Sequence, residues 1–322
     1  MPSFNHLHDK NQTLFVRLKS VTYEARDVLL FEFMSLDGQF LPSFSAGSHI
    51  DIYLPNGLIR QYSLCNSPLD KNRYLVAVKR DLQSRGGSTL MHDGLKVGSE
   101  LKISFPRNNF ELAKEASHSI LIGGGIGITP LISIAHELTA QKFSWQLFCS
   151  FRNRSDVALV DQLDADKIHL HIDDESPSGF MGIADILNNA PVGSHFYCCG
   201  PEAMLKNFIE LSRSIEPSRV HYEFFKPVAT QLSGDSFEVK LHKTKKSFSI
   251  GPDETILQVL QKNGISAPGS CEQGICGTCE THVVEGIPDH RDSLLSADER
   301  SSNKVIMICC SRSLSPSSTL DL

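Results

Sequence analysis

Four cysteines late in the sequence have the residue type and spacing most suited to chemistry. Cys271, Cys276 and Cys279 follow the pattern C-x4-C-x2-C, and Cys309 comes further along the chain. This is the spacing of a plant-type [2Fe–2S] site. Thiolates suit the iron of such clusters, and glycines in the same loop let backbone N–H groups turn toward the sulfurs. The pattern therefore predicts a [2Fe–2S] cluster in this loop.

Two features of the cysteine pattern leave alternatives open. A zinc site is one, because His282 and His290 lie nearby, although two separated ligand pairs are more typical of structural zinc. Cys310 is the other, since either Cys309 or Cys310 could supply the fourth thiolate. The chain has nine cysteines, an odd number, and no secretory signal, which argues against a disulfide framework.

A glycine-rich stretch earlier in the chain is typical of a nucleotide site. An apolar run leads into a loop with Gly124, Gly125 and Gly127, after which Thr129 and Pro130 open a helix. We expect Thr129 to cap that helix and Pro130 to be its first residue. Such a loop lets a pyrophosphate approach the backbone at a helix N-terminus. The stretch departs from G-x-G-x-x-G, so tight packing of a strand on a helix explains it equally well.

Two shorter motifs are informative because of where they lie in the chain. Cys199-Gly200-Pro201 ends a predicted strand, and ligands bind at the carboxyl ends of strands in α/β sheets. A cysteine in such a place is more often a buried apolar residue than a participant in chemistry. Arg60-Gln61-Tyr62-Ser63 offers an arginine for a phosphate and a tyrosine that can stack on a flat ring. An exposed arginine beside a half-buried tyrosine on a strand is the ordinary alternative.

Hydrophobic patterning predicts the elements that must position these residues. Up to about residue 107 the chain has short strands separated by turn signals such as Asn56-Gly57 and Gly86-Gly87, which suggests a β-barrel or sandwich. The predicted strands are residues 14–21, 28–34, 49–54, 74–79 and 101–104.

From about residue 117 to 227, strands alternate with helices, which predicts a doubly wound α/β layer with a parallel sheet. Its predicted strands are residues 120–122, 145–150, 168–172 and 195–199. Its predicted helices are residues 131–138, 156–163, 183–188 and 201–214.

The rest of the chain is a small strand-rich unit with one helix, residues 255–262, and the cysteine loop. We place three domains at residues 1–113, 114–228 and 237–322, with a polar linker at 229–236.

Composition argues against several classes of protein. The 322 residues are 40% hydrophobic and 21% charged, as in an ordinary globular protein. With 31 Lys and Arg against 37 Asp and Glu, the net charge is −6 and no basic block appears, which argues against nucleic-acid binding. The longest uncharged run, residues 119–135, holds four glycines and a proline and so does not resemble a membrane span. We expect a cytoplasmic protein that binds neither nucleic acid nor membrane.

Taken in order, these motifs make the sequence similar to the phthalate dioxygenase reductase family, the single-chain reductases of Rieske-type oxygenases. The resemblance covers residues 12–322 and rests on residues 60–63, 85–88, 123–130, 199–201, 271–279, 288–292 and 310–322. Within the family, residues 145–147 and 274–281 are most similar to carnitine monooxygenase reductases. Vanillate demethylase reductases are nearly as similar.

The resemblance implies a multidomain fold with an FMN-binding β-barrel, a doubly wound NAD domain, and an α+β plant-type ferredoxin domain of the β-grasp class. It implies that Arg60, Gly87 and Ser88 bind the FMN phosphate, and that Cys309 is the fourth iron ligand. The residues that it places around the flavin ring are Gln61, Tyr62, Ser63, Ala77, Val78, Lys79, Thr129 and Phe225. The residues that it places around the nicotinamide nucleotide are Gly124, Gly125, Gly127, Cys199, Gly200 and Pro201. Of these, Thr129, Cys199 and Phe225 are the expected catalytic residues.

The resemblance also implies an activity. Hydride passes from NADH to FMN, and single electrons then pass through the [2Fe–2S] cluster to a terminal Rieske-type oxygenase. Carnitine or another quaternary amine is the first expectation for that oxygenase's substrate, and an aromatic acid such as vanillate is the second. The alternatives are a stand-alone NAD(P)H:ferredoxin or flavin reductase, and a redox-sensing or electron-storing protein. Arg152 follows the second strand of the α/β segment, where a cation could meet the 2′-phosphate of NADPH, although the resemblance favours NADH.

Overall fold

The computed structural model describes residues 12–81, 86–113, 115–177, 179–226 and 233–322. The chain divides into two compact units, Met1–Phe225 and Lys226–Leu322. This division leaves the domain boundaries at 113/114 and 236/237 as predictions, and residues 229–232 of the predicted linker lie outside the described residues. Within the described ranges, no helix combines the length and the apolar content needed to cross a bilayer.

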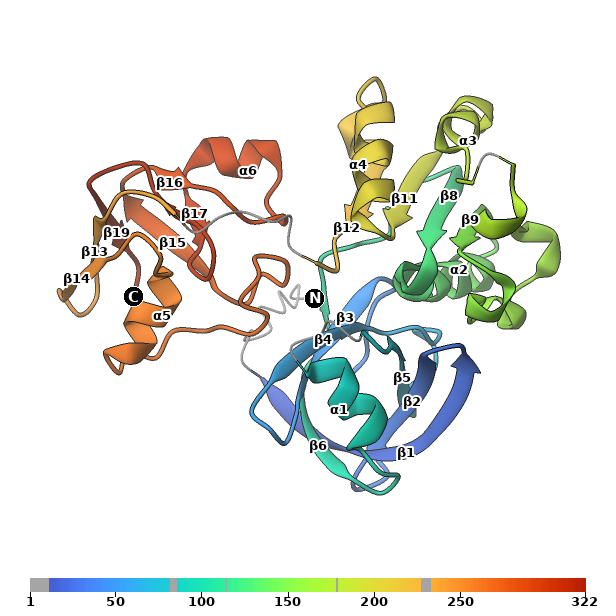
Figure 1. Cartoon of the computed structure of the whole chain (residues 1–322), viewed down its shortest axis with the longest axis horizontal. Coiled ribbons are helices and arrows are strands. Elements are labelled where there is room, and N and C mark those ends of the chain that lie inside the picture. The colour runs from blue at the N-terminus through green and yellow to red at the C-terminus, as the bar shows by residue number, and fades with distance from the viewer. Residues whose placement is uncertain (1–11, 82–85, 114, 178, 227–232) are drawn as a thin grey trace, which may run out of the picture. The chain divides into compact units, whose positions relative to one another are not determined.

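The first unit begins with a barrel (Figure 1). Its sheet has the strand order β4-β3-β6-β1-β2-β5, with β7 paired to β3. The end strands β4 and β5 contact each other, which closes the sheet, and α1 packs Met91 into the barrel core. The elements are β1 (Thr13–Ala25), β2 (Val28–Ser35), β3 (Ser48–Tyr53), β4 (Ile59–Ser63), β5 (Arg73–Lys79), α1 (Gly87–Asp93), β6 (Glu100–Ser104) and β7 (Arg107–Asn108).

A parallel five-stranded sheet follows in the same unit, in the order β10-β9-β8-β11-β12. The chain fills one half of the sheet from β8 outward and then crosses to β11, so the strand order reverses between β8 and β11. The strands are β8 (His118–Gly124), β9 (Ser144–Phe151), β10 (Ile168–Ile172), β11 (His195–Cys199) and β12 (Val220–Glu223). The α-helices are α2 (Ile128–Ala140), α3 (Ile183–Asn189) and α4 (Glu202–Leu211). The 3-10 turns are η1 (Gly125–Gly127), η2 (Arg154–Asp156), η3 (Val160–Gln162), η4 (Ala165–Lys167), η5 (Asp173–Glu175) and η6 (Pro217–Arg219).

The two faces of the parallel sheet pack into different cores. Helix α2 covers the face that carries Leu121, Leu147 and Tyr197, while α3 and α4 cover the face that carries Ile122 and Phe196. The α2 core also takes in residues from the barrel, including Ala46, Cys65, Ala77 and Phe110. The backbone N–H of Ala113 donates to the Tyr197 hydroxyl at 2.9 Å, which ties the connection between the two layers to the sheet. The barrel and the α/β layer therefore share one apolar core.

The helix predicted at residues 156–163 is wrong. The structure has two separate 3-10 turns there, η2 and η3, with Leu159 in the left-handed region at a φ of 63°. The β1–β2 turn of the barrel holds this segment: the Glu24 carboxylate accepts from Leu159 N–H at 2.7 Å, and Arg26 N–H donates to Ser155 O at 2.9 Å. The Arg26 guanidinium also donates twice to Asp156. These long-range bonds replace the bonds that a helix would have made.

Three further predictions need correction. Helix α2 begins at Ile128, so Thr129 does not cap it; the Thr129 hydroxyl donates to Ile126 O at 3.1 Å because η1 runs directly into the helix. Gly86-Gly87 opens helix α1 instead of only turning between strands, with Gly86 at a φ of 92°. The helix predicted to run to residue 214 ends at Leu211. The strands predicted for the barrel and the parallel sheet are confirmed, within a few residues at their ends.

The second unit contains a mixed five-stranded sheet in the order β14-β13-β19-β15-β17, and a small hairpin of β16 and β18. Strand β19 is central, parallel to β13 and antiparallel to β15. Helix α5 starts at a capping box between Thr255 and Gln258 and packs Leu257 and Leu260 into the core. The elements are β13 (Phe237–Leu241), β14 (Ser247–Ile250), α5 (Ile256–Lys262), β15 (Glu280–Glu285), β16 (Pro288–Asp289), α6 (Ala297–Ser302), β17 (Val305–Met307), β18 (Arg312–Ser313) and β19 (Ser317–Leu320).

Substituting Glu24→Ala should lower the free energy of unfolding of the first unit by about 1–3 kcal/mol, because it leaves the buried N–H of Leu159 without an acceptor. Urea titration monitored by circular dichroism measures the change. Glu100→Ala is the matched control, since its pair with Arg17 is about half exposed and should contribute less than about 1 kcal/mol. Equal effects of the two substitutions would contradict the role given to the Glu24 contact.

Candidate functional site

The glycine loop lies where β8 and β11 separate. In a doubly wound sheet, ligands bind at the carboxyl ends of the strands where the strand order reverses. Here β8 ends at Gly124 and β11 ends at Cys199, two strands that pair in parallel. A Cβ atom on Gly127 would lie 2.5 Å from Cys199 O and 2.6 Å from the Cα of Gly200. Only glycine permits this approach, so the loop packs directly against the backbone of Cys199 and Gly200.

The surroundings of Gly124 and Gly125 also explain why these positions are glycine. A Cβ on Gly124 would lie 2.6 Å from Pro201 Cδ and 2.9 Å from Met204 Sδ. Gly125 has a φ of 52° and open space where a side chain would project. The structure therefore brings together Gly124, Gly125, Gly127, Gly200 and Pro201 as predicted, with Thr129 buried on the first turn of α2 behind them.

Cys199 and Glu223 are neighbours at this edge of the sheet. They occupy the same register position on the parallel strands β11 and β12. Cys199 is fully buried, and burial together with the Glu223 carboxyl raises the pKa of its thiol. Phe225, two residues beyond Glu223, is half-buried and packs against the core shared with the barrel. Cys199 and Phe225 thus lie at the predicted edge, and Cys199 is a neutral thiol there.

Glu223 is the site residue that the sequence interpretation missed. Its Oε2 atom is sealed from solvent without a hydrogen-bond partner, and burial raises the pKa of the carboxyl to about 8. A perturbed carboxyl at a ligand-binding edge is a candidate for function. The signal in the sequence was a lone acid within the aromatic stretch 221–225, two residues before Phe225.

The residues of the string 60–63 lie on β4, but on two faces. Strand alternation puts Arg60 and Tyr62 on one face, opposite Ile52 and Ile50 of β3, and puts Gln61 and Ser63 on the other. A Cβ on Gly87 would overlap the Arg60 side chain, so the guanidinium stem lies against the start of α1. Burial raises the pKa of the Tyr62 hydroxyl, although the nearby Arg60 opposes this. Arg60 and Gly87 are therefore together, while Gln61 lies away from them.

Strand β5 provides the remaining predicted flavin residues. Ala77 faces the core shared with the α/β layer, Val78 faces the barrel core, and Lys79 is exposed at the end of the strand. The Ser88 hydroxyl accepts from Asp81 N–H at 3.1 Å, which joins the start of α1 to the segment after β5. Strand β5 also contacts η1. The predicted flavin strand and the predicted nucleotide loop are therefore adjacent.

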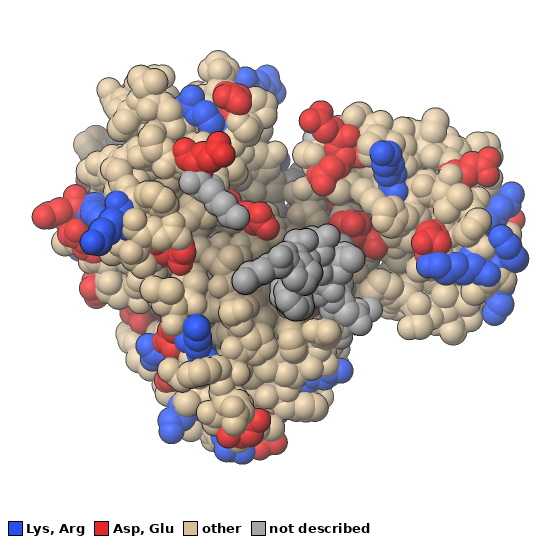
Figure 2. Space-filling view, turned by 180° about the vertical axis from the view of Figure 1, so that it is seen from behind, with Lys and Arg blue, Asp and Glu red and all other residues tan. Residues whose placement is uncertain are grey.

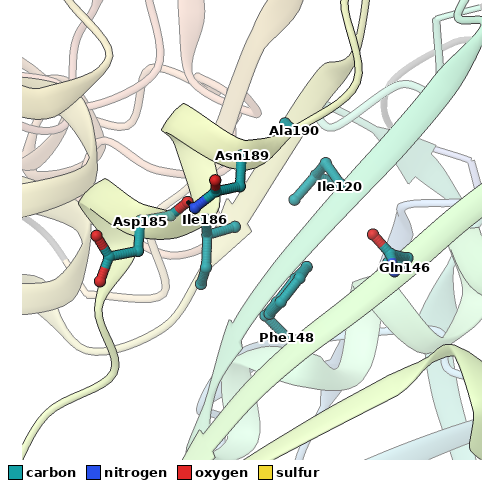
Figure 3. Close-up of a pocket in the computed structure, with 7 residues that line it drawn as sticks. All are labelled: Ile120, Gln146, Phe148, Asp185, Ile186, Asn189 and Ala190. Carbon is teal, nitrogen blue, oxygen red and sulfur yellow. Dashed lines mark hydrogen bonds between the residues drawn. The ribbon is translucent and has the colours of Figure 1, made fainter.

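A hollow on the face of the parallel sheet lies elsewhere. Figure 3 shows seven residues around a cavity of about 280 Å³ between α3 and strands β8 and β9. Ile120, Phe148 and Ile186 give it apolar walls, and Gln146 and Asp185 are polar groups at its edge. None of the predicted site residues lines it, and the lining residues lie on the sheet face instead of at the carboxyl ends of the strands. We therefore place the candidate site at the Gly124–Cys199 edge.

The four predicted iron ligands come together in the second unit. Cys271 and Cys276 lie in the loop before β15, Cys279 directly precedes β15, and Cys309 follows β17. All four are at most 9% exposed. The thiol of Cys271 interacts with those of Cys276 and Cys309, and the thiol of Cys309 also interacts with that of Cys279. Four converging thiols are the donor set of a [2Fe–2S] cluster.

Polar groups of the same loop reach the sulfurs. Gln273 N–H donates to Cys271 Sγ at 3.3 Å, and Cys276 Sγ and Thr278 Oγ1 are hydrogen bonded at 3.3 Å. The Ser270 hydroxyl is buried without a partner, as expected of a donor that faces a cofactor. Gly274, at a φ of 69°, leaves room for Cys310, whose Sγ lies 2.5 Å from where a Cβ would be. Cys310 thus packs behind the loop, beside Cys309.

The cysteine arrangement differs from that of a single-ion site. In the part of the chain that the structure describes, no three His, Cys, Asp or Glu side chains are grouped to hold one metal ion. A [2Fe–2S] cluster needs no such group, because each of its irons takes two protein ligands. The choice of a cluster over zinc rests on the C-x4-C-x2-C spacing.

Comparison with known proteins agrees with this assignment. Residues 239–314 match the family described as 2Fe-2S iron-sulfur cluster binding domain. Phenoxybenzoate dioxygenase subunit beta of Ectopseudomonas oleovorans is 42% identical over 310 residues, 95% of this chain and 97% of that protein. Vanillate O-demethylase oxidoreductase of Pseudomonas sp. (strain HR199 / DSM 7063) is 40% identical, over 95% of this chain and 99% of that protein.

The solved structure of phthalate dioxygenase reductase is similar over the whole length. It matches with a TM-score of 0.73 at 36% identity and covers 96% of this chain and 98% of that chain. The fold, the cluster domain and these similarities define a pyridine-nucleotide-dependent flavoprotein reductase that carries its own [2Fe–2S] cluster. The chain belongs to the phthalate dioxygenase reductase family.

Replacing Glu223 by Gln should change how stability depends on pH. The carboxyl has an ordinary pKa of 4.5 in the unfolded chain and a pKa of about 8 in the folded protein. Between these values the unfolded chain loses the proton that the folded protein keeps, so the wild type loses stability as pH rises through this window. We expect the slope to differ from that of the variant by up to about 1.4 kcal/mol per pH unit. Urea titrations from pH 5 to 8 measure it, with Glu216→Gln as an exposed control; parallel curves for wild type and Glu223→Gln would contradict the assignment.

Thr278→Ala should lower the reduction potential of the cluster by about 20–60 mV. A hydrogen bond to a ligand sulfur stabilises the more negative reduced state, and its loss is worth about 0.5–1.5 kcal/mol. Redox titration followed by electron paramagnetic resonance measures the potential. Thr278→Ser keeps the hydroxyl and should restore it, whereas Thr244→Ala, exposed on the β13–β14 turn, should have no effect. An unchanged potential in Thr278→Ala would disprove the role of this bond.

Proposed function

We propose that this chain is the reductase component of an oxygenase system. It takes electrons from NADH and delivers them through FMN and a [2Fe–2S] cluster to a terminal Rieske-type oxygenase. The observation that carries the proposal is that one chain combines a glycine loop at the carboxyl end of β8, in contact with barrel strand β5, with four converging thiols. The relatives named for phenoxybenzoate dioxygenase and vanillate O-demethylase support an oxygenase as the electron acceptor.

FMN fits the edge of the barrel. The Arg60 side chain lies against Gly87 at the start of α1, and its guanidinium suits a phosphate. Arg60, Gly87 and Ser88 would hold the phosphate, and Tyr62, Ser63 and the end of β5 at residues 77–79 would border the ring. When bound, FMN supplies the conversion between the two-electron chemistry of nicotinamide and the one-electron chemistry of the cluster.

The pyridine nucleotide fits the crevice between β8 and β11. Its pyrophosphate would rest on the backbone of Gly124–Gly127 at the start of α2, where Gly125 has open space in place of a side chain. Cys199 would form a neutral, water-excluding side of the nicotinamide pocket, and Phe225 would cover the flavin. Thr129 holds the loop by donating to Ile126 O. Glu223 keeps its proton below about pH 8, so it adds no negative charge at neutral pH.

The cluster would be held by Cys271, Cys276, Cys279 and Cys309. Cys309 is preferred to Cys310 because its thiol interacts with those of Cys271 and Cys279, whereas that of Cys310 interacts with Cys309 and packs behind Gly274. Two substrate classes are proposed for the partner oxygenase. Motif similarity in the cysteine loop supports carnitine or another quaternary amine, and the named relatives support an aromatic acid equally.

Anaerobic titration with NADH tests the electron path. In the wild type, we expect the flavin absorbance to bleach and a rhombic reduced-cluster signal to appear in low-temperature electron paramagnetic resonance. Cys271→Ser should still bleach with NADH but lose the cluster signal, because one iron loses a thiolate. Cys310→Ser is the matched control at a neighbouring cysteine and should keep both signals. Bleaching without a cluster signal in the wild type would reduce the protein to a simple flavin reductase, and no bleaching would overturn the proposal.

A further inference from the structure

Two arginines stand at the edge of the parallel sheet next to the proposed nucleotide crevice. Arg152 follows Phe151, the last residue of β9, and Arg154 begins η2. Their side chains are 80% and 70% exposed. The end of the second strand of a doubly wound sheet is where a protein distinguishes the ribose 2′-hydroxyl of NADH from the 2′-phosphate of NADPH. Two free arginines there would favour the phosphate.

The structure does not leave these arginines free. Strand β10 runs beside β9 and ends at the same edge, and it is followed by the acidic turn η5, Asp173–Glu175. Arg154 Nη2 lies 2.7 Å from Glu175 Oε2, and Arg152 Nε lies 3.9 Å from Asp174 Oδ1. The backbone joins the two segments as well, because Asp174 N–H donates to Arg152 O at 3.0 Å. Each guanidinium therefore faces a carboxylate.

The third acid of the turn is held in place by the sheet. The Ser150 hydroxyl donates to Asp173 Oδ1 at 2.6 Å, and His171 Nε2 lies 3.5 Å from the same oxygen. This fixes the start of the acidic turn at the end of β9. The group holds three carboxylates, of which two pair with the two guanidiniums, so the carboxylates outnumber the guanidiniums at this edge.

This charge balance discriminates between the two nucleotides. A 2′-phosphate would have to displace carboxylates from both arginines and would then remain beside three carboxylates. A ribose hydroxyl is neutral and can donate to a carboxylate without that repulsion. The exposed pairs contribute little to stability, and the face drawn in Figure 2 carries several such mixed groups of charge. In this position the ion pairs determine which of the two nucleotides is rejected.

We propose that Asp174 and Glu175 set the preference for NADH over NADPH, by neutralising Arg152 and Arg154 and repelling a 2′-phosphate. The inference rests on the proposed nucleotide site at this sheet edge. Asp174 neutralises the Arg152 guanidinium, so Arg152 affects the choice of nucleotide without binding it directly. This refines the expectation from the sequence that Arg152 binds the cofactor.

The test compares Asp174→Asn/Glu175→Gln with the wild type. Steady-state assays with ferricyanide give kcat/KM for NADH and for NADPH, and calorimetry gives the affinities for adenosine 5′-monophosphate and adenosine 2′,5′-bisphosphate. We expect the NADH:NADPH ratio of kcat/KM to fall at least tenfold, and the affinity for the bisphosphate to rise by a similar factor. Affinity for the monophosphate should change less than threefold.

Two further variants complete the test. Adding Arg152→Ala and Arg154→Ala to the double variant should remove the gained bisphosphate affinity, because the freed arginines provide it. Glu100→Gln/Glu210→Gln makes the same change in net charge at ion pairs on β6 and α4 and should leave the ratio unchanged. A wild type that prefers NADPH, or a double variant with a ratio within twofold of the control, overturns the inference. A wild type that oxidises neither nucleotide and binds neither adenosine probe overturns the proposed function itself.

Discussion

The apolar core that the barrel shares with the α/β layer is the interaction on which the first unit depends. Ala77 of the flavin strand and Leu121, Ile128 and Leu131 of the nucleotide layer belong to one buried cluster. Because close-packed interiors transmit small displacements, this core fixes the spacing between β5 and the turn η1. In the proposed function, a flavin on one side and a nicotinamide on the other would have to meet within van der Waals distance, and packing of the core would set that distance.

Both units use glycine where a loop must pack closely against the rest of the protein. At Gly127 the loop approaches the backbone of Cys199 and Gly200, and at Gly274 it approaches the thiol of Cys310. In each place a methyl group would collide with these atoms. In the proposed function, the same loops would bring N–H groups to phosphate oxygens in one unit and to sulfurs in the other. Two unrelated chemistries thus depend on the same conformational property.

Features with a local physical cause could be predicted from the sequence. The cysteine spacing indicated the cluster loop, and alternating apolar residues indicated most strands, because both depend on residues close together in the chain. The structure of segment 156–163 could not be predicted from its helical pattern. Hydrogen bonds from Glu24 and Arg26, more than a hundred residues away, hold it in a different conformation. Thr129 has the residue type of a helix cap but lies inside the helix, because η1 supplies the preceding turn.

The candidate site also combines features that the sequence could indicate with features that depend on distant parts of the chain. The residue types at Arg60, Gly127 and Cys199 indicated their positions, while the facing of side chains on β4 and the contact between β5 and η1 emerged only in three dimensions. Glu223 was overlooked because a pKa depends on burial, which a linear pattern does not contain. Likewise, the partners of Arg152 and Arg154 come from a different strand.

The central position of β19 has a consequence for how the second unit is assembled in the cell. This strand separates β13 from β15 in the sheet that supports the cysteine loop, and it follows Cys309 in the chain. A ribosome must therefore synthesise every thiol ligand before the platform beneath them can close. Until then, the four thiols belong to an incomplete sheet. Closing of the sheet that supports the cluster loop thus follows synthesis of the barrel and the parallel layer, which precede it in the chain and can already have folded.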